Sequence, residues 1–417
     1  MSAVTAILPI RVLDLTNERG FLCGKMLAEL GADVIKIEGV RESPSGNPDL
    51  LYNRLPEGEK SLFWFAYNAG KRCITLNIEI ADGQEIFKQL AKNADVVIES
   101  FNPQYMNSLG LGYETLSKIY PRLIFVSITP FGQTGPYKDY LDSDLILSAM
   151  GGVLYLTGDP ERRPVRISFP QSYLHGAAEA AVATMLAYYW REETEEGQYI
   201  DVAVQPSLLL GTSNAIPRWY LNKELSQRSG TRRMGYNAFG AAPRQIWRCK
   251  DGYIAFMLMG ARVGARTNSR LVEWMEGEGM ANDTLKSVDW NNYDMRMVKP
   301  HELEIIEDCI GKFFMAHTKA ELYEGVIKRN IMLCPVNTVK DIVEDRQLES
   351  RKFWQQIEHP QLTSPIKYPG SSFRFSEIES ALVPRIPYPG QHNQEIYEGD
   401  LGLSPEEILR LKDANVI

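Results

Sequence analysis

The sequence lacks an excess of positive charge, a metal-ligand pattern and a signal segment ahead of its first predicted strand. Its formal net charge is −8 and its pI is near 5.4, so its overall field would repel nucleic acid and anionic membranes. Its five cysteines are scattered and odd in number, which gives neither a disulfide framework nor metal-ligand spacing. We therefore expect no metal, no nucleic-acid or membrane partner, and a location in the reducing cytoplasm.

The longest apolar helix candidate, residues 176–190, is too short for a membrane span. A span needs about 20 residues, and Glu179 lies near the start of this segment. We expect a buried helix instead. The sequence also lacks visible internal repeats and low-complexity tracts, so it gives no support to a solenoid or a disordered tail.

Apolar runs of strand length alternate with helical patterns in the first part of the chain. A run at 10–16, a helical pattern at 21–30 and a run at 33–38 form the first unit, and the order recurs at 74–78, 84–92 and 95–99, then at 113–120 and 123–128. This alternation predicts an α/β fold with a doubly wound, Rossmann-like parallel sheet. Ligands of such sheets bind outside the carboxyl ends of the strands.

The length of 417 residues exceeds what one core usually supports, so we expect two domains. A long helix at 173–193 and a strand at 199–204 complete the large domain, which we place at residues 1–220. Residues 225–335 are rich in Met, Arg, Gly and Asn, contain a strand-like run at 244–257, and predict a smaller α/β domain. A helical pattern at 405–413 lies near the end.

Seven segments carry a family resemblance: RVLDLT, LGADVIKIE, NAGKRCITLN, ADVVIESFNP, LGLGYETL, PRLIFVSITPFGQTGPY and EEGQYIDVAV, in this order between residues 11 and 204. Together they resemble the class III CoA-transferases, a family that includes formyl-CoA, carnitine and benzylsuccinate CoA-transferases and the α-methylacyl-CoA racemases. The resemblance implies CoA as a substrate moiety, an interlocked dimer, and a C-terminal segment, residues 336–417, that returns to the large domain.

CoA requires cations for its phosphates, hydrogen-bond donors and an apolar surface for its adenine. The predicted strand ends supply such groups, although exposed Lys and Arg at strand ends are often ordinary solvated charges. The loop FGQTGPY matches the family and is expected to shape the active-site wall. With the resemblance, the candidate CoA-binding residues are Arg41, Lys71, Arg72, Ser100, Phe101, Asn102, Phe131 and Gly132.

The stretch at 164–176, PVRISFPQSYLHG, contains no acid. The resemblance implies a nucleophilic Asp four residues before the Gly that opens the long helix; here Gly176 is preceded at that distance by Ser172, with Gln171 beside it. Gln cannot ionise, and a Ser ester would be too stable for transfer. We therefore expect no catalytic residue in this chain, and a hetero-oligomer in which a paralogous subunit carries the Asp.

The substrates that the resemblance suggests are succinyl-CoA and (R)-benzylsuccinate, as in anaerobic toluene degradation. Two alternatives remain open. An active homomeric transferase, isomerase or racemase could use His175 and Glu179, which share a helix face at i, i+4, although a structural pair explains them as well. A CoA-binding scaffold without catalysis is the other. We expect Asp144 to have a structural or capping role.

Overall fold

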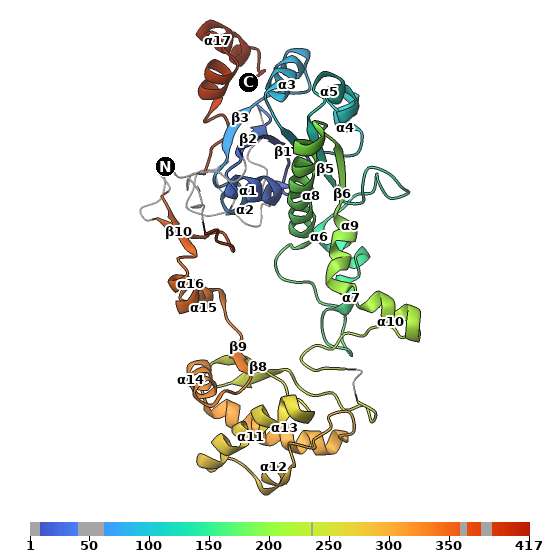
Figure 1. Cartoon of the computed structure of the whole chain (residues 1–417), viewed down its shortest axis with the longest axis vertical. Coiled ribbons are helices and arrows are strands. Elements are labelled where there is room, and N and C mark those ends of the chain that lie inside the picture. Colours follow the sequence, from blue (N-terminus) through green and yellow to red (C-terminus); the bar gives the residue numbers. More distant parts are fainter. Residues whose placement is uncertain (1–8, 41–61, 235–236, 359–364, 377–385) are drawn as a thin grey trace. The chain divides into compact units, whose positions relative to one another are not determined.

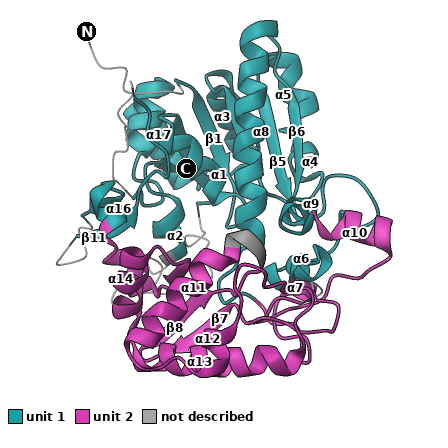
Figure 2. Ribbon diagram, turned by 60° about the horizontal axis from the view of Figure 1, so that its bottom comes forward, with its two compact units in different colours: residues 1–153, 167–213, 347–417 teal, residues 154–166, 214–346 magenta. Residues whose placement is uncertain are grey.

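The computed structural model describes residues 9–40, 62–234, 237–358, 365–376 and 386–417. The chain forms two compact units, the first made of residues 1–153, 167–213 and 347–417 and the second of residues 154–166 and 214–346 (Figure 2). The first unit therefore joins the N-terminal part of the chain to its C-terminal segment.

The first unit contains a six-stranded parallel sheet, as the alternating pattern predicts. Its strands are β1 (Arg11–Leu15), β2 (Asp33–Glu38), β3 (Arg72–Thr75), β4 (Val96–Glu99), β5 (Ile124–Thr129) and β6 (Tyr199–Ala203), in the spatial order β3-β2-β1-β4-β5-β6. Each neighbouring pair is parallel. The strand order reverses between β1 and β4, which is the switch point where doubly wound sheets bind ligands.

Helices cover both faces of this sheet because the strands are apolar on both sides. On one face α1 (Phe21–Glu29) and α8 (Ser172–Thr194) lie side by side (Figure 1) and pack on Val12, Val34 and Ile98. On the other face, Leu13 and Ile35 pack with α3 (Ala81–Lys92), α5 (Tyr113–Ile119) and α17 (Pro405–Asp413). The C-terminal helix therefore belongs to the core of the sheet.

The remaining elements of the first unit are short. They are α2 (Leu62–Tyr67), α4 (Tyr105–Ser108), α6 (Asp144–Met150), α9 (Val204–Ser207), η2 (Leu208–Thr212), β10 (Trp354–Ile357), β11 (Ile366–Pro369) and the π-helical turn η3 (Glu395–Asp400). Two further short helices, α7 (Val153–Leu156) and α16 (Arg346–Ser350), each span a boundary between the units.

The second unit packs helices on a small antiparallel sheet, β7 (Ile246–Cys249), β8 (Gly252–Phe256) and β9 (Leu333–Pro335). The run at 244–257, expected as one strand-like stretch, is a hairpin, because the Lys250–Asp251 turn reverses the chain before Gly252. The helices are α10 (Ala215–Asn222), α11 (Ala261–Gly277), α12 (Asp283–Ser287), α13 (Pro300–Ala316), α14 (Lys319–Arg329) and α15 (Val339–Val343).

Candidate functional site

A cavity of about 880 Å³ opens at the carboxyl ends of β1 to β4. This is the edge of the sheet that the strand pattern predicts for ligand binding. Its lining comes from five separate parts of the first unit and consists of Leu15, Thr16, Asn17, Glu18, Lys36, Ile37, Glu38, Gly39, Val40, Leu76, Asn77, Ile78, Glu79, Ile80, Ser100, Phe101, Tyr105, Ala414 and Asn415.

One wall of the cavity is aromatic. The rings of Phe101 and Tyr105 lie 4.7 Å apart between centroids, and the Tyr105 hydroxyl donates to Glu79 at 2.9 Å. Glu99 holds the loop behind them, because its carboxylate accepts the backbone N–H of Phe101 at 2.7 Å. Such a wall offers a flat apolar surface with polar groups at its rim, which suits a purine base.

Ser100 holds the loop that follows β1. Its hydroxyl donates to Asn17 Oδ1 and accepts from the Asn17 backbone N–H, each at 2.9 Å. The loops after β1 and β4 are therefore tied together at the switch point of the sheet. Ser100 and Phe101, both predicted from the sequence, lie in the lining of one cavity.

Lys36 is the one cation among the described lining residues. Its ammonium group already bonds to other groups of the protein. Its Nζ lies 2.6 Å from Glu38, 3.0 Å from the Ile37 carbonyl and 3.3 Å from the Asp14 carbonyl. Burial alone would lower the pKa of Lys36, but Glu38 and Asp14 outweigh it and raise that pKa. Lys36 therefore stays charged and neutralises its carboxylates rather than a ligand. Arg41, a predicted phosphate contact, lies outside the described residues.

Lys71 does not line the cavity. Its ammonium is fully buried, 2.8 Å from Asp14 Oδ2, and also donates to the Phe21 carbonyl and Asn68 Oδ1 at 2.9 Å. Burial alone would raise the pKa of Asp14, but Lys71 and Lys36 outweigh it and hold that pKa below its usual range. The lysine expected to meet a phosphate instead compensates a buried carboxylate.

Arg72 lies at the opposite edge of the sheet. It is the first residue of β3 and pairs with Asp33, the first residue of β2, at 2.6 Å, and with Glu395 at 2.8 Å. The structure thus does not bring Lys71 and Arg72 together with Phe101 in one cavity, contrary to our expectation. Strand polarity explains the position of Arg72, since the first residue of a parallel strand lies at the edge away from the ligand face. Lys71 is instead kept from the cavity by its burial against Asp14 and the Phe21 carbonyl.

The other predicted contacts lie near β4 and β5 but outside the cavity lining. Asn102 is exposed. Phe131 packs edge-on against Tyr137, with ring centroids 6.2 Å apart. Gly132 adopts a left-handed φ of 91° in a tight turn, which glycine allows without strain. These two residues shape the loop after β5.

The segment before α8 is tied to α6 by Asp144. The Asp144 carboxylate accepts the backbone N–H groups of Gln171 at 2.8 Å and Ser172 at 2.9 Å. The Ser172 hydroxyl donates to the Asp144 carbonyl at 3.1 Å, and Ser172 is 1% exposed. Asp144 thus makes the structural contacts that we expected, and Ser172 is not open to a substrate.

His175 and Glu179 do not form a pair. Both lie on α8, where His175 is exposed and Glu179 is half-buried. Within the described residues, neither side chain makes a hydrogen bond or an ion pair. No described residue is therefore placed to activate either group as an acid, a base or a nucleophile.

Sequence reasoning missed several lining residues. Tyr105 could have been found, since it stands four residues after Phe101 and carries a flat ring. Asn415 could not, because about three hundred residues of chain separate it from β4 and only the fold brings it to the cavity.

No group of three or more His, Cys, Asp or Glu side chains in the described parts of the chain could hold a metal ion. Among the same residues, no helix is both long and apolar enough to cross a bilayer.

Comparison with known proteins decides the family. The family model described as CoA-transferase family III matches residues 9–393. The chain belongs to this family. Subunit BbsE of succinyl-CoA:(R)-benzylsuccinate CoA-transferase from Thauera aromatica is 35% identical, over 93% of this chain and 92% of that protein.

Two more relatives agree. The beta subunit of succinyl-CoA–L-malate CoA-transferase from Chloroflexus aurantiacus is 30% identical over the whole of both chains. The crystal structure of a CAIB/BAIF family protein from Brucella suis superposes with a TM-score of 0.80 at 25% identity, over 94% of this chain and 98% of that one. The α/β fold and the family inferred from the sequence are thus confirmed.

Proposed function

We propose that this chain is a subunit of a class III CoA-transferase that holds CoA at the carboxyl ends of β1 to β4 and depends on a paralogous subunit for the catalytic aspartate. The observation that carries the proposal is that Gln171 and Ser172 occupy the expected nucleophile position. Gln171 cannot ionise, and Ser172 is buried and bonded to Asp144.

The chemistry explains why these residues cannot replace an aspartate. In the family mechanism a carboxylate oxygen attacks the thioester carbon of the donor, the C–S bond breaks, and CoA thiolate leaves with its electron pair. The thiolate then attacks the aspartyl carbonyl of the resulting anhydride, which releases the free donor acid and leaves an enzyme thioester. The acceptor carboxylate next attacks the carbonyl of that thioester, and CoA thiolate leaves. The thiolate then attacks the acceptor carbonyl of the new anhydride and expels the aspartate carboxylate, so the nucleophile must also be a competent leaving group. An amide or a seryl ester does not meet this requirement.

The cavity supports the binding half of the proposal. Phe101 and Tyr105 offer stacking surface for adenine, and stacking of a base on an aromatic residue contributes about 1–3 kcal/mol. Asn17 and Ser100 offer polar groups beside them. Since Lys36 is engaged by the protein, phosphate-binding cations must come from outside the described lining.

Two observations support a partner subunit. Two relatives are named as subunits of their enzymes. In addition, α8 exposes a stripe of large apolar side chains along one side, with Val182 54%, Leu186 66% and Tyr189 70% exposed. Such a stripe on a helix is typical of a protein–protein interface.

The proposed substrates follow the names of these relatives. Both names include succinyl-CoA, and one also names (R)-benzylsuccinate. We propose succinyl-CoA as donor and a dicarboxylic acid of this kind as acceptor.

Covalent trapping tests the catalytic half. The purified chain is incubated with succinyl-CoA, then treated with borohydride or hydroxylamine, and its mass is measured after digestion. We expect no modification within residues 155–193 and no turnover. A CoA or succinyl adduct there would overturn the proposal and direct attention to Glu179 and His175.

Calorimetry tests the binding half separately. Phe101→Ala should weaken CoA binding about tenfold, because it removes the stacking surface. The matched control is Phe373→Ala, which removes an exposed ring outside the cavity and should leave CoA affinity unchanged. Equal affinities for both variants would place CoA elsewhere.

A further inference from the structure

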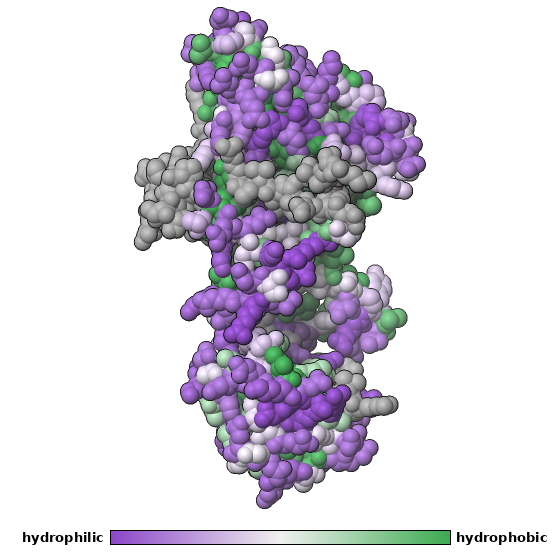
Figure 3. Space-filling view, turned by 60° about the vertical axis from the view of Figure 1, so that its left-hand side comes forward, coloured by the Kyte–Doolittle hydropathy of each residue, from purple (hydrophilic) through white to green (hydrophobic). Residues whose placement is uncertain are grey.

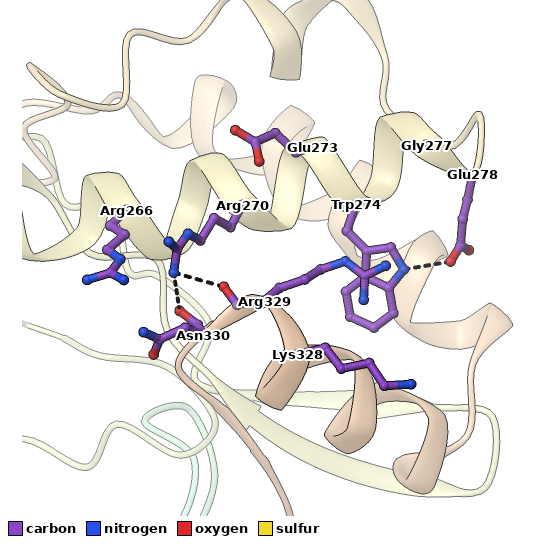
Figure 4. Close-up of a pocket in the computed structure, with 9 residues that line it drawn as sticks. All are labelled: Arg266, Arg270, Glu273, Trp274, Gly277, Glu278, Lys328, Arg329 and Asn330. Carbon is purple, nitrogen blue, oxygen red and sulfur yellow. Dashed lines mark hydrogen bonds between the residues drawn. The ribbon is translucent and has the colours of Figure 1, made fainter.

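A second cavity, made wholly by residues of the second unit, is rich in cations. It has a volume of about 500 Å³ and lies between α11 and the end of α14 (Figure 4). Four cations and two carboxylates line it in a chain whose net charge is −8, so it is a local excess of positive charge. Its lining residues are Arg266, Arg270, Glu273, Trp274, Gly277, Glu278, Lys328, Arg329 and Asn330.

Two of the cations are held in place by the protein. Arg270 donates through Nη1 to the carbonyls of Arg329 at 3.0 Å and Asn330 at 3.5 Å, and so caps the end of α14. The Arg329 guanidinium lies 4.3 Å from the centre of the Trp274 ring and donates through Nη1 to the Gly325 carbonyl. Their Nε and Nη2 groups have no partner among the described residues, so oriented donors remain for an anionic ligand.

The other two cations, Arg266 and Lys328, make no hydrogen bond or ion pair with a described residue. Arg266 stands one helical turn before Arg270 on α11, an arrangement of like charges that lowers helix stability. Neither capping nor pairing therefore accounts for Arg266 and Lys328.

The two carboxylates do not neutralise these cations. Glu278 accepts from Trp274 Nε1 at 2.6 Å and pairs with His317 at 2.9 Å. Figure 4 draws the Glu273 carboxylate on the other side of the α11 ribbon from Arg266 and Lys328. In the same view the four cations form a row from Arg266 on the left through Arg270 and Arg329 to Lys328, with Trp274 beside Arg329. A row of cations fits several linked anionic groups better than one small ion.

We propose that this cavity, lined by α11 and the end of α14, binds a linear polyphosphate chain. Guanidinium groups match phosphate oxygens bidentately, and the row of Arg266, Arg270, Arg329 and Lys328 supplies successive contacts. The site is a binding site additional to the proposed transferase function and does not depend on it. Because the cavity is open to solvent, its affinity should fall as salt rises.

Calorimetry with inorganic tripolyphosphate on the full chain at low salt tests this site. We expect one-to-one binding that weakens at least tenfold in the double variant Arg266→Ala, Lys328→Ala. The control, Arg248→Ala with Lys312→Ala, removes two exposed cations of the same unit from outside the cavity and should bind as the unchanged chain does. Absence of binding to the unchanged chain, an equal loss in both variants, or citrate binding as tightly as tripolyphosphate would overturn the proposal.

CoA also carries a diphosphate, so it could itself be the ligand of this cavity. Measuring CoA binding to the same double variant distinguishes CoA from a free polyphosphate or a nucleotide. If CoA itself occupies the cavity, the double variant Arg266→Ala, Lys328→Ala weakens CoA binding as well as tripolyphosphate binding. If the ligand is a free polyphosphate or a nucleotide, CoA binding is unchanged in that variant. Both results support a phosphate site. Loss of CoA binding in Phe101→Ala with tripolyphosphate binding retained would show that the two cavities act independently.

Discussion

Lys71 shows how a residue that matches a ligand-binding pattern can serve the fold instead. It follows the α2 segment and precedes β3, yet its ammonium is sealed beneath the cavity against Asp14 and Asn68. An ammonium without exposure cannot reach a phosphate, and a buried Asp14 without Lys71 would lose its ion-pair partner and one of the two lysines that lower its pKa.

We predict that Lys71→Met destabilises the protein by about 3–5 kcal/mol, because the variant leaves the Asp14 charge buried without its partner. Adding Asp14→Asn should restore part of this loss, since it removes the stranded charge. Urea unfolding of the single and double variants measures both effects. Unchanged stability of Lys71→Met together with weakened CoA binding would instead assign Lys71 to the ligand.

Glu99 is the buried carboxyl group that positions Phe101. Burial raises its pKa from the ordinary 4.5 to about 7, although bonds from Ser127 and the Phe101 N–H oppose the rise. A carboxyl whose pKa is raised in the fold binds more protons folded than unfolded. Its contribution to stability is therefore fully present below about pH 4.5 and is lost as the pH rises toward 7.

We predict that the stability of the unchanged protein falls by about 3 kcal/mol, relative to Glu99→Gln, between pH 4.5 and pH 7.5. Gln keeps an oxygen that can accept the Phe101 N–H but does not titrate in this range. Denaturant titrations of both proteins across that range give the difference. A constant difference would mean that Glu99 titrates normally.

At the scale of elements, α1 packs closely on the polar pair beneath the cavity. A Cβ on Gly24 would stand 2.2 Å from Asp14 Oδ2 and 2.9 Å from Lys71 Nζ. Glycine is a poor helix former, so its presence inside α1 is explained by this close approach and not by helix propensity. The buried Asp14–Lys71 pair and the position of α1 are therefore coupled.

We predict that Gly24→Ala destabilises the protein by about 1–3 kcal/mol through overpacking, despite the better helix propensity of alanine. Gly311→Ala in α13 is the matched control. Among the described residues its Cβ would meet Trp247 alone, at 3.9 Å, so alanine should stabilise by about 0.5–1 kcal/mol. Thermal unfolding distinguishes the two, and a stabilising Gly24→Ala would contradict the packing argument.

At the scale of the whole molecule, large apolar side chains are exposed on several helices. Most of the coloured atoms in Figure 3 belong to hydrophilic residues. In the first unit, α6 and α8 expose several large apolar residues, among them Leu145 46%, Leu186 66%, Tyr189 70% and Trp190 55%. Exposed apolar surface raises the free energy of an isolated chain in water. Association that buries this surface lowers that free energy.

We predict that this chain, co-expressed with an Asp-bearing paralogue, forms a stable hetero-oligomer through α8. Native mass spectrometry should show the complex, and Leu186→Arg with Tyr189→Arg should abolish it without unfolding the chain, since both positions are exposed. Leu409→Arg on α17, also exposed, is the control and should leave assembly intact. A homodimer that ignores the paralogue and turns over substrate would refute the assembly.

The sequence by itself determined most strands of the large sheet and the absence of a carboxylate at the expected nucleophile position. Alternating apolar runs and helical patterns are local properties, so β2 (Asp33–Glu38) and α17 (Pro405–Asp413) begin and end where the pattern predicts. The family motifs are likewise linear and indicated the family, while Ser100 and Phe101 were found because they follow a strand directly.

Only the tertiary structure decided which of the predicted cations are free to contact a ligand. Lys71 and Arg72 are neighbours in sequence, yet one compensates Asp14 beneath the cavity and the other pairs with Asp33 at the far edge of the sheet. Asn415 reaches the cavity from the other end of the chain. Burial and charge pairing depend on distances between remote segments, and a linear pattern carries no information on those distances.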